Sequence, residues 1–317
     1  MNRTKASVAI FAYNHAKFVE EAIASVLAQQ TDFDFEVVIG EDCSTDGTRA
    51  IVRRYRDKFP NRIRLLLNET NLGDFGNFAH TVSACRGEYM AILDGDDYWT
   101  CSQKLQRQVD FLDAHPDYSI CFHNAMMIWD DGSHPPTLHS PPTRRPTYDL
   151  EELLVHDFIS TGSVVVRRGL VKTFPDWWWR APFFDWPFLV LHAMHGKIGY
   201  LDECWSTYRQ HPAGIYSRLS HGKRMEENLQ AVRLYRDVMD PDYEELLTRS
   251  VSSRCLMLAL HYQKAGNRTL SDEYAKIAVQ EGDRRWLRRW RNRLKVYTYM
   301  RAPSLYQFVC NRRQHRG

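Results

Sequence analysis

Three carboxylates crowd into one short turn of the sequence. Asp94, Asp96 and Asp97 follow the apolar run MAIL, which is typical of a buried strand, and Gly95 stands among them. Like charges at this spacing repel one another, and the burial of even one carboxylate costs free energy. We therefore expect a cation here, because carboxylate oxygens suit Mg²⁺ or Mn²⁺, in particular an ion shared with phosphate groups. The alternative is a solvated acidic turn that binds nothing.

A second candidate site lies in the segment VVIGEDCSTDGT, where Glu41 and Asp42 end another apolar run. A carboxylate at a strand end can accept the imide N–H of a base such as uracil, so Asp42 is a candidate nucleotide-binding residue. Guanine also offers an N–H, and the pattern leaves both bases open. The turn from Ser44 to Asp46 is interpreted as a plain helix cap.

Strands that alternate with helices must position these residues. Apolar runs predict strands at residues 7–14, 35–42, 62–68 and 89–97, and helical spacing predicts helices at residues 16–29, 44–59 and 77–85. This alternation predicts an α/β fold with a mostly parallel sheet wrapped by helices. In such sheets, ligands bind at the carboxyl ends of the strands. The residues at those ends are Asn14, Glu41, Asp42 and the cluster that begins at Asp94.

Length and composition indicate one large domain and a smaller one. The chain has 317 residues, of which 44% are hydrophobic and 13% aromatic. The sequence contains neither a membrane-spanning apolar run nor a cleavable signal pattern at its start. Its seven cysteines form no CxxC pair, which argues against a disulfide framework or a structural zinc site. We expect a cytoplasmic protein, or one attached peripherally to the inner face of the plasma membrane.

The pattern changes to helices alone after about residue 220. We therefore predict a first domain at residues 1–220 and a helical region with a basic tail at residues 221–317. The segment RRWLRRWRNRLKVYTYM places tryptophans among arginines, which is typical of segments that lie on anionic lipid. The alternative is a helix that packs its tryptophans on the domain and exposes its arginines.

The ordered motifs of the chain together resemble family 2 glycosyltransferases of the GT-A fold. The resemblance covers roughly the first two thirds and rests on SVAIFAYN, VVIGEDCSTDGT, NLGDFGNF, GEYMAILDGDDYW, FFDWPFLVLHAMHGKIGYLDE and YRQHPAG. It implies metal-dependent, inverting transfer of a sugar from a nucleotide-diphosphate sugar, with UDP favoured. The acceptor would be a hydroxyl of a glycan or lipid-linked glycan in bacterial surface polysaccharide synthesis.

The resemblance also implies roles for the strand ends. In that family, the residue that matches Asp42 recognises the base, and the strand end near Ala12 and Tyr13 lines the nucleotide pocket. The residues that match Asp94 and Asp96 hold the ribose and the metal-bound diphosphate. The predicted nucleotide-binding residues are Ala12, Tyr13, Asn14, Glu41, Asp42, Asp94 and Gly95.

A general base is implied at Asp185, which the string FFDWPFLVLHA keeps although Phe184 stands where the family commonly has glutamate. A carboxylate there would take the acceptor proton. From the residues alone, Asp185 is also a good N-cap for a helix that begins near Pro187. The two readings are compatible.

The motif YRQHPAG implies a loop that closes over the diphosphate. The resemblance makes His211 a metal ligand together with Asp96, on Mn²⁺ or Mg²⁺, and makes Arg209 a phosphate partner. The chemistry agrees, because a neutral imidazole binds transition metals and a guanidinium clamps phosphate.

Tryptophans surround the predicted base. Trp178, Trp179 and Trp186 are predicted acceptor-binding residues, because aromatic faces stack on the C–H surfaces of sugars. Ordinary packing is the alternative, and we expect it to hold for at least one tryptophan of this segment.

Three other classes of protein are alternatives to a glycosyltransferase. A sugar nucleotidyltransferase would need a glycine-rich, lysine-bearing phosphate loop near the start, where FAYNHAKF stands instead. A nucleic-acid partner is not expected, because the acidic cluster would repel a phosphate backbone and no reading motif is recognisable. A non-catalytic nucleotide-sugar binder stays open.

Overall fold

The computed structural model describes residues 4–140 and 145–281, which form parts of two compact units. The first unit ends at Ser217 and the second begins at Arg218. The sequence analysis places this boundary three residues later, after residue 220.

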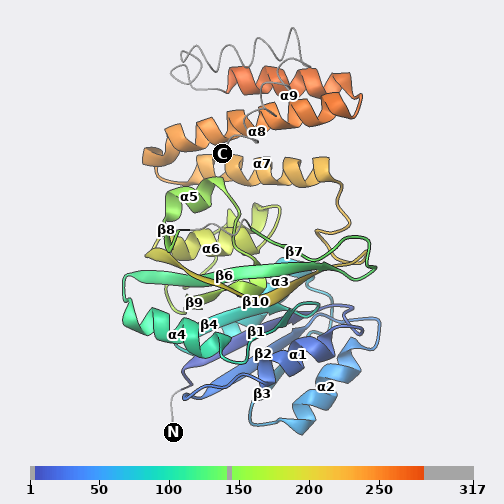
Figure 1. Ribbon diagram of the computed structural model, residues 1–317, viewed down its shortest axis with the longest axis vertical. Coiled ribbons are helices and arrows are strands. Elements are labelled where there is room, and N and C mark those ends of the chain that lie inside the picture. Colours follow the sequence, from blue (N-terminus) through green and yellow to red (C-terminus); the bar gives the residue numbers. More distant parts are fainter. Residues whose placement is uncertain (1–3, 141–144, 282–317) are drawn as a thin grey trace. The chain divides into compact units, whose positions relative to one another are not determined.

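A mixed sheet forms the centre of the first unit. Its strands are β1 (Ala6–Ala12), β2 (Phe35–Glu41), β3 (Ile63–Leu67), β4 (Tyr89–Asp94), β5 (Tyr98–Trp99), β6 (Tyr118–Trp129), β7 (Thr137–Leu138), β8 (Thr147–Tyr148), β9 (Val165–Arg167) and β10 (Lys197–Gln210). In the described residues their order is β3-β2-β1-β4-β9-β6-β10-β5, with β7 on β6 and β8 on β10 (Figure 1).

The predicted parallel half of the sheet is present. β1 pairs in parallel with β2 and β4, and β2 pairs in parallel with β3. The register sets Ala12 opposite Glu41 and Phe11 opposite Asp94, so the predicted strand ends meet at one edge. Beyond β4, however, β9 is antiparallel to both β4 and β6, and only β6 and β10 are parallel. The sheet therefore contains both kinds of pairing, and its long ladders are the parallel ones.

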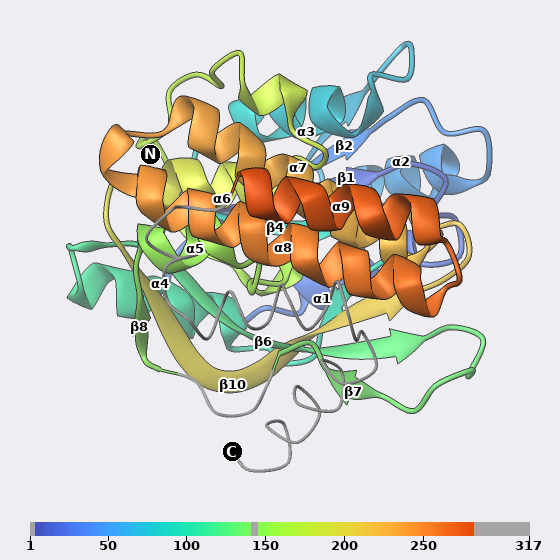
Figure 2. The ribbon, with the colours of Figure 1, turned by 90° about the horizontal axis from the view of Figure 1, so that it is seen from above.

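Helices cover both faces of this sheet (Figures 1 and 2). They are α1 (Val19–Leu27), α2 (Thr48–Lys58), α3 (Gly73–Ala84), α4 (Lys104–Ala114), α5 (Leu150–Val155) and α6 (Asp185–Ala193). Helices α1, α2 and α4 pack on the face to which Val8 and Ile10 of β1 point. On the other face, Phe11 contacts Phe78 of α3, which contacts Phe188 of α6. Because both faces are covered, β1 is apolar and buried along its whole length.

The second unit consists, in its described part, of α7 (His221–Val238), α8 (Glu244–Lys264) and α9 (Arg268–Gln280). A polar contact ties the three helices together, because Glu226 of α7 accepts hydrogen bonds from Tyr262 of α8 and Tyr274 of α9 at 2.7 and 3.0 Å. Within the described ranges, no helix is both long and apolar enough to cross a membrane.

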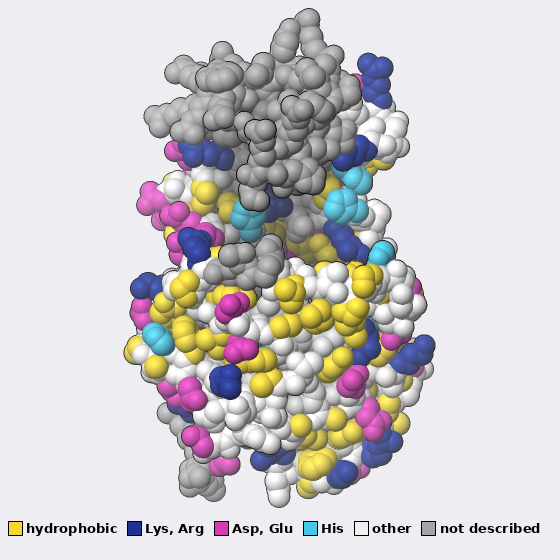
Figure 3. Space-filling model, in the orientation of Figure 1, with side chains coloured by type: hydrophobic (Ala, Val, Ile, Leu, Met, Phe, Trp, Pro, Cys, Tyr) yellow, Lys and Arg dark blue, Asp and Glu magenta, His cyan; other side chains and the backbone are white. Residues whose placement is uncertain are grey.

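Charges of both signs are interspersed with hydrophobic side chains on the face of the first unit that Figure 3 shows. The predicted membrane-binding helix begins after Asp283 and lies outside the described residues. Its lipid contact therefore stays a prediction.

Candidate active site

Carboxylates from three parts of the first unit converge at the end of β4. Burial raises the pKa of Asp94 well above its usual range, and the neighbouring charges of Asp96, Asp185 and Asp74 raise it further. Asp185 comes from α6 and Asp74 from the first turn of α3, so the fold brings the predicted base to the predicted metal motif. Asp74 was not predicted, although it follows the turn in NLGDFGNF.

Asp96 is held by two imidazoles. Its Oδ2 atom lies 2.9 Å from Nε2 of His211 and 3.6 Å from Nε2 of His15. Burial acts to raise the pKa of Asp96, but the two histidines outweigh burial and lower it. His15 was not predicted, although it directly follows the strand end at Asn14. Gly95 is required beside it, because a Cβ there would lie 2.8 Å from Nδ1 of His15.

Arg209 holds the acidic turn in place. Its backbone N–H donates to Oδ1 of Asp97 at 2.8 Å, and its Nε donates to the carbonyl of Asp96 at 2.9 Å. The guanidinium also pairs with Glu21 at 2.6 Å and Asp130 at 3.6 Å. Its position is therefore set by protein carboxylates, and its contact with phosphate stays a prediction.

Asp97 faces the inside of the unit. Burial raises its pKa well above the usual range, and the nearby charges of Asp96 and Asp94 add to this effect. Tyr208 of β10 lies near these groups and was not predicted. Burial raises the pKa of its phenol, and the nearby charges of Asp97, Asp96 and Asp185 raise it further. The site therefore contains a phenol among carboxylates.

No group of three or more His, Cys, Asp and Glu side chains in the described part of the chain is preassembled as a metal site. The predicted ligands Asp96 and His211 are brought together, but they contact each other. A cation at Asp96 would therefore need further ligands from a bound molecule, such as phosphate oxygens.

Asp42 lies at the end of β2 as predicted, and only 2% of it is exposed. Its Oδ1 atom accepts hydrogen bonds from Nδ2 of Asn68 and from the backbone N–H of Leu72, both at 2.8 Å. The exposed side chain of Tyr13 stands at the end of the neighbouring strand β1. Asn68 was not predicted, because it is a neutral residue directly after β3 and no motif marked it.

Glu41 does not have the role predicted for it. It is fully buried, forms an ion pair with Arg49, and accepts a hydrogen bond from the backbone N–H of Ser44 at 2.6 Å. Because its side chain has no exposed surface and bonds only inside the protein here, it supports the turn after β2 and does not face a nucleotide. The prediction of Glu41 as a nucleotide-binding residue is wrong.

Asn14 ties two strand ends together. Its backbone has a φ of 55°, its Oδ1 accepts from the N–H of Thr45 at 2.9 Å, and its N–H donates to Oγ of Ser44 at 3.0 Å. The buried Ala12 accepts the N–H of Asp42 through its carbonyl at 3.0 Å. Both residues shape the predicted nucleotide edge, and their contact with a nucleotide stays a prediction.

Asp185 is the first residue of α6, and Phe184 occupies the N-cap position. The interpretation of Asp185 as an N-cap is therefore wrong. Its Oδ2 accepts from Oγ1 of Thr161 at 2.8 Å and its Oδ1 from the N–H of Trp186 at 2.8 Å. Thr161 begins the short helix η1 (Thr161–Ser163).

The predicted acceptor-binding tryptophans divide into two kinds. Trp178 and Trp186 are completely buried, and their indole N–H groups donate to the carbonyls of Phe184 and Leu153 at 3.1 and 2.6 Å. These two cannot meet an acceptor, so their predicted role is wrong. Trp179 is 49% exposed, and its contact with an acceptor stays a prediction.

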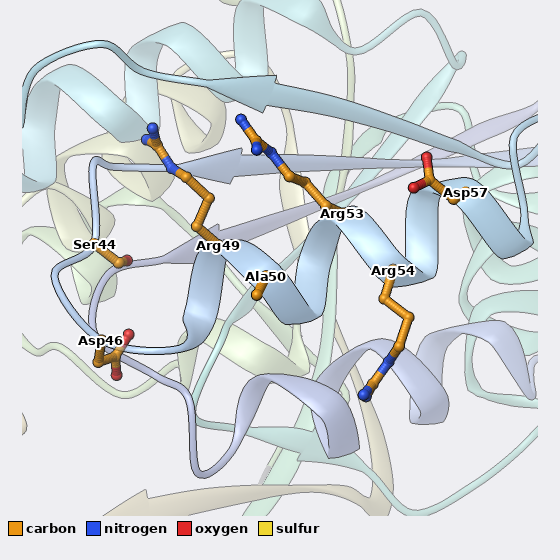
Figure 4. A pocket seen from close by; sticks show the side chains of 7 residues that line it. All are labelled: Ser44, Asp46, Arg49, Ala50, Arg53, Arg54 and Asp57. Carbon is orange, nitrogen blue, oxygen red and sulfur yellow. The ribbon is translucent and has the colours of Figure 1, made fainter.

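A groove of about 680 Å³ runs along α2, away from the carboxylates (Figure 4). Arg49 and Arg53 extend to one side of the helix and Arg54 to the other. Arg49 pairs with Glu41 and Arg54 with Glu20, at 2.8 Å in the second pair. None of the carboxylates of the site lines this groove, and we assign it no part in the chemistry.

Comparison with known proteins identifies the family. The family model described as Glycosyl transferase family 2 matches residues 7–174, which is more than half of the chain. The chain therefore belongs to glycosyl transferase family 2, as its ordered motifs predicted.

The curated relatives are similar over part of their length. An uncharacterized protein of Mycobacterium tuberculosis (strain ATCC 25618 / H37Rv) is 39% identical over 210 residues, which make up 66% of this chain and 60% of that protein. The chain thus spans less than two thirds of that relative. Staphylococcus aureus TarS, a poly(ribitol-phosphate) beta-N-acetylglucosaminyltransferase, is 36% identical over 115 residues, 35% of this chain and 19% of that protein.

Solved structures share the fold. TarS 1-349 of S. aureus in complex with UDP-GlcNAc gives a TM-score of 0.55 at 18% identity and covers 86% of this chain and 92% of that one. The mannosyltransferase PcManGT of Pyrobaculum calidifontis, in complex with GDP-Man and Mn²⁺, gives 0.59 at 18% identity, with 89% and 76% covered. At this identity the likeness concerns the fold alone, and it confirms the predicted GT-A fold.

Proposed function

We propose that the first unit transfers a sugar from a nucleotide-diphosphate sugar, with UDP favoured, to a hydroxyl of a glycan or lipid-linked glycan. The observation that carries this proposal is the convergence of Asp185 with Asp94 and Asp96 at a sheet edge that also presents Asp42. The proposed base reader and diphosphate end then lie at one edge of the sheet, and the proposed general base lies near the diphosphate end.

The diphosphate end suits Mn²⁺ or Mg²⁺. Asp96 and His211 supply a carboxylate oxygen and an imidazole nitrogen. The raised pKa values of Asp94 and Asp97 reflect burial among other carboxylates, and a cation nearby would stabilise their ionised forms. A divalent ion bound there would stabilise the departing diphosphate as a Lewis acid. His15 lies beside the Asp96 carboxylate, and Arg209 holds the backbone of Asp96 by donating to its carbonyl.

Asp185 serves as the general base. Thr161 and the N–H of Trp186 fix the direction of its carboxylate, which is half-buried and so remains reachable. It takes the proton of the acceptor hydroxyl while that oxygen attacks the anomeric carbon from the face opposite the diphosphate. A single displacement of this kind inverts the anomeric configuration.

The donor sugar carries no negative charge in this proposal. Asp74, Asp94 and Asp185 surround the place where the sugar would lie, and carboxylates accept hydroxyl and amide N–H groups but repel a uronic acid. A hexose or an N-acetylhexosamine fits these acceptors. Exposed Trp179 would face the acceptor sugar.

The acceptor is proposed to belong to a bacterial surface polysaccharide, which is supported by the similarity to TarS, a poly(ribitol-phosphate) beta-N-acetylglucosaminyltransferase. A cytoplasmic position, or a peripheral one at the inner membrane face through residues after Asp283, would bring the site to a lipid-linked acceptor. Liposome sedimentation of the full chain and of a chain shortened at Asp283 tests that placement.

The test of the function is a transfer assay with Asp185→Asn. We expect turnover to fall about 10²- to 10⁴-fold with donor affinity retained, because general-base catalysis contributes on that scale. Asp176→Asn, an exposed aspartate just before the same segment, is the matched control and should turn over normally. NMR of the product should show an inverted anomeric carbon, and chelator should abolish transfer.

A retained anomeric configuration would refute the role of Asp185. Donor binding with no transfer to any acceptor would instead favour the non-catalytic binder. Formation of a nucleotide-diphosphate sugar and pyrophosphate from a sugar phosphate and a nucleoside triphosphate would favour the nucleotidyltransferase.

A further inference from the structure

One oxygen of Asp42 is already occupied by the protein. Two N–H donors, from Nδ2 of Asn68 and the backbone of Leu72, point at the same atom Oδ1 at 2.8 Å each. Two hydrogen bonds satisfy the lone pairs of one carboxylate oxygen. Oδ1 therefore has no room for a donor from a ligand.

The other oxygen is open. Oδ2 of Asp42 receives no hydrogen bond from the described residues. It is not fully shielded from solvent either, because it is not one of the described side-chain atoms that lack both solvent contact and a hydrogen-bond partner. The residue as a whole is only 2% exposed. Asp42 thus presents a single acceptor atom through a narrow opening.

Asn68 cannot easily release Oδ1, because its own side chain is fixed from several sides. Its Oδ1 lies 2.9 Å from Nδ1 of His80, and its Nδ2 also donates to Oδ1 of Asn77 at 3.2 Å. Its backbone carbonyl accepts a hydrogen bond from Arg49 at 2.6 Å. An N–H at Nδ1 of His80 donates to the side-chain oxygen of Asn68, and this orientation turns the amide nitrogen of Asn68 toward Asp42.

The bases differ in how many donors they offer to a carboxylate. Uracil and thymine present one imide N–H between two carbonyls, which a single acceptor satisfies. Guanine presents its ring N–H and its amino group side by side, and these two donors need both oxygens of a carboxylate. Cytosine has a lone pair at the corresponding ring nitrogen, which a carboxylate repels.

We propose that Asn68 is a specificity-determining residue that makes Asp42 a single-acceptor reader, selective for uridine and thymidine diphosphates over guanosine and cytidine diphosphates. This inference rests on the proposed function, because it assumes that a nucleotide binds at Asp42. It resolves the choice between uracil and guanine that the sequence pattern leaves open.

Calorimetry of the full chain with UDP, dTDP, GDP and CDP in the presence of Mn²⁺ tests the inference. We expect UDP and dTDP to bind at least about tenfold more tightly than GDP, since guanine leaves one donor unpaired. Asn68→Ala opens Oδ1 and should reduce the ratio of UDP to GDP affinity severalfold. Asn71→Ala is the matched control, because Asn71 donates to the backbone carbonyl of Asp42 and should leave that ratio unchanged.

The outcomes separate the two proposals. If GDP binds the unmodified protein as tightly as UDP, the role of Asn68 and the preference for UDP are refuted, while the proposed sugar transfer stands. If Asn68→Ala folds, as judged by circular dichroism, and keeps the original ratio, the role is again refuted. If no nucleotide diphosphate binds at all, both proposals fail.

Discussion

Lys104 makes a quantitative prediction about stability. This lysine of α4 is completely buried, and its Nζ lies 4.0 Å from the centre of the Trp99 ring with no hydrogen-bond partner among the described residues. Burial lowers its pKa from 10.5 to about 7. Replacing it by methionine, which has a similar length and no charge, removes a buried cation that the folded state holds at a cost.

The size of the effect follows from proton linkage. Between pH 7 and pH 10.5 the unfolded chain keeps a proton that the folded protein has mostly lost, so the free energy of unfolding rises with pH. The slope approaches about 1.4 kcal/mol per pH unit within this window. Because the Lys104 amine of the folded protein is only half deprotonated at pH 7, the free energy of unfolding increases by about 2 kcal/mol from pH 7 to pH 9.

Lys104→Met should therefore be more stable than the unmodified protein at pH 7, and this advantage should shrink by about 2 kcal/mol at pH 9. Cys121 and His123 do not titrate in this range, because burial raises the pKa of the Cys121 thiol to about 12 and lowers the pKa of His123 well below its usual value. Urea unfolding followed by tryptophan fluorescence measures the difference, with the exposed Lys172→Met as control. An advantage that is constant with pH would refute the reasoning.

Three further changes test the site. Thr161→Val should lower turnover about tenfold at unchanged donor affinity, because it removes a hydrogen bond to Asp185, and Thr161→Ser should restore it; equal rates in both variants would contradict this role. Trp179→Ala should raise the KM for the acceptor severalfold in initial-rate assays and leave donor binding intact. An unchanged KM would show that Trp179 does not bind the acceptor. Asp96→Ala should abolish the Mn²⁺ dependence of UDP binding in calorimetry, where persistence of that dependence would place the ion elsewhere.

The sequence predicted the nucleotide half of the site because local patterns encode it. The strands that end at Asp42 and Asp94 are covered on both faces, so they are apolar runs that stop abruptly at a carboxylate. Parallel pairing then sets their ends at one edge without further information. The family resemblance supplied His211 and Arg209, which no local pattern would have indicated.

The errors arose where partners lie far apart in the chain or where burial decides the role. Glu41 was predicted to bind a nucleotide, but it is buried and paired with Arg49. Trp178 and Trp186 were predicted to stack on a sugar, but their N–H groups donate to backbone carbonyls inside the core. Residue type does not distinguish an exposed indole from a buried one. Asn68 was not predicted, because its proposed role depends on which oxygen of Asp42 it binds.

The contact between His211 and Asp96 joins residues that are 115 positions apart, and Arg209 reaches Glu21 across 188. During synthesis, β1 to β4 leave the ribosome long before β10, and so the acidic turn emerges without the groups that hold it. Contacts of such long range also form late in folding, because the intervening chain must first be ordered. A chain whose translation stops before residue 211 would contain the base reader but no assembled site, so an incomplete product would have no transfer activity in the cell.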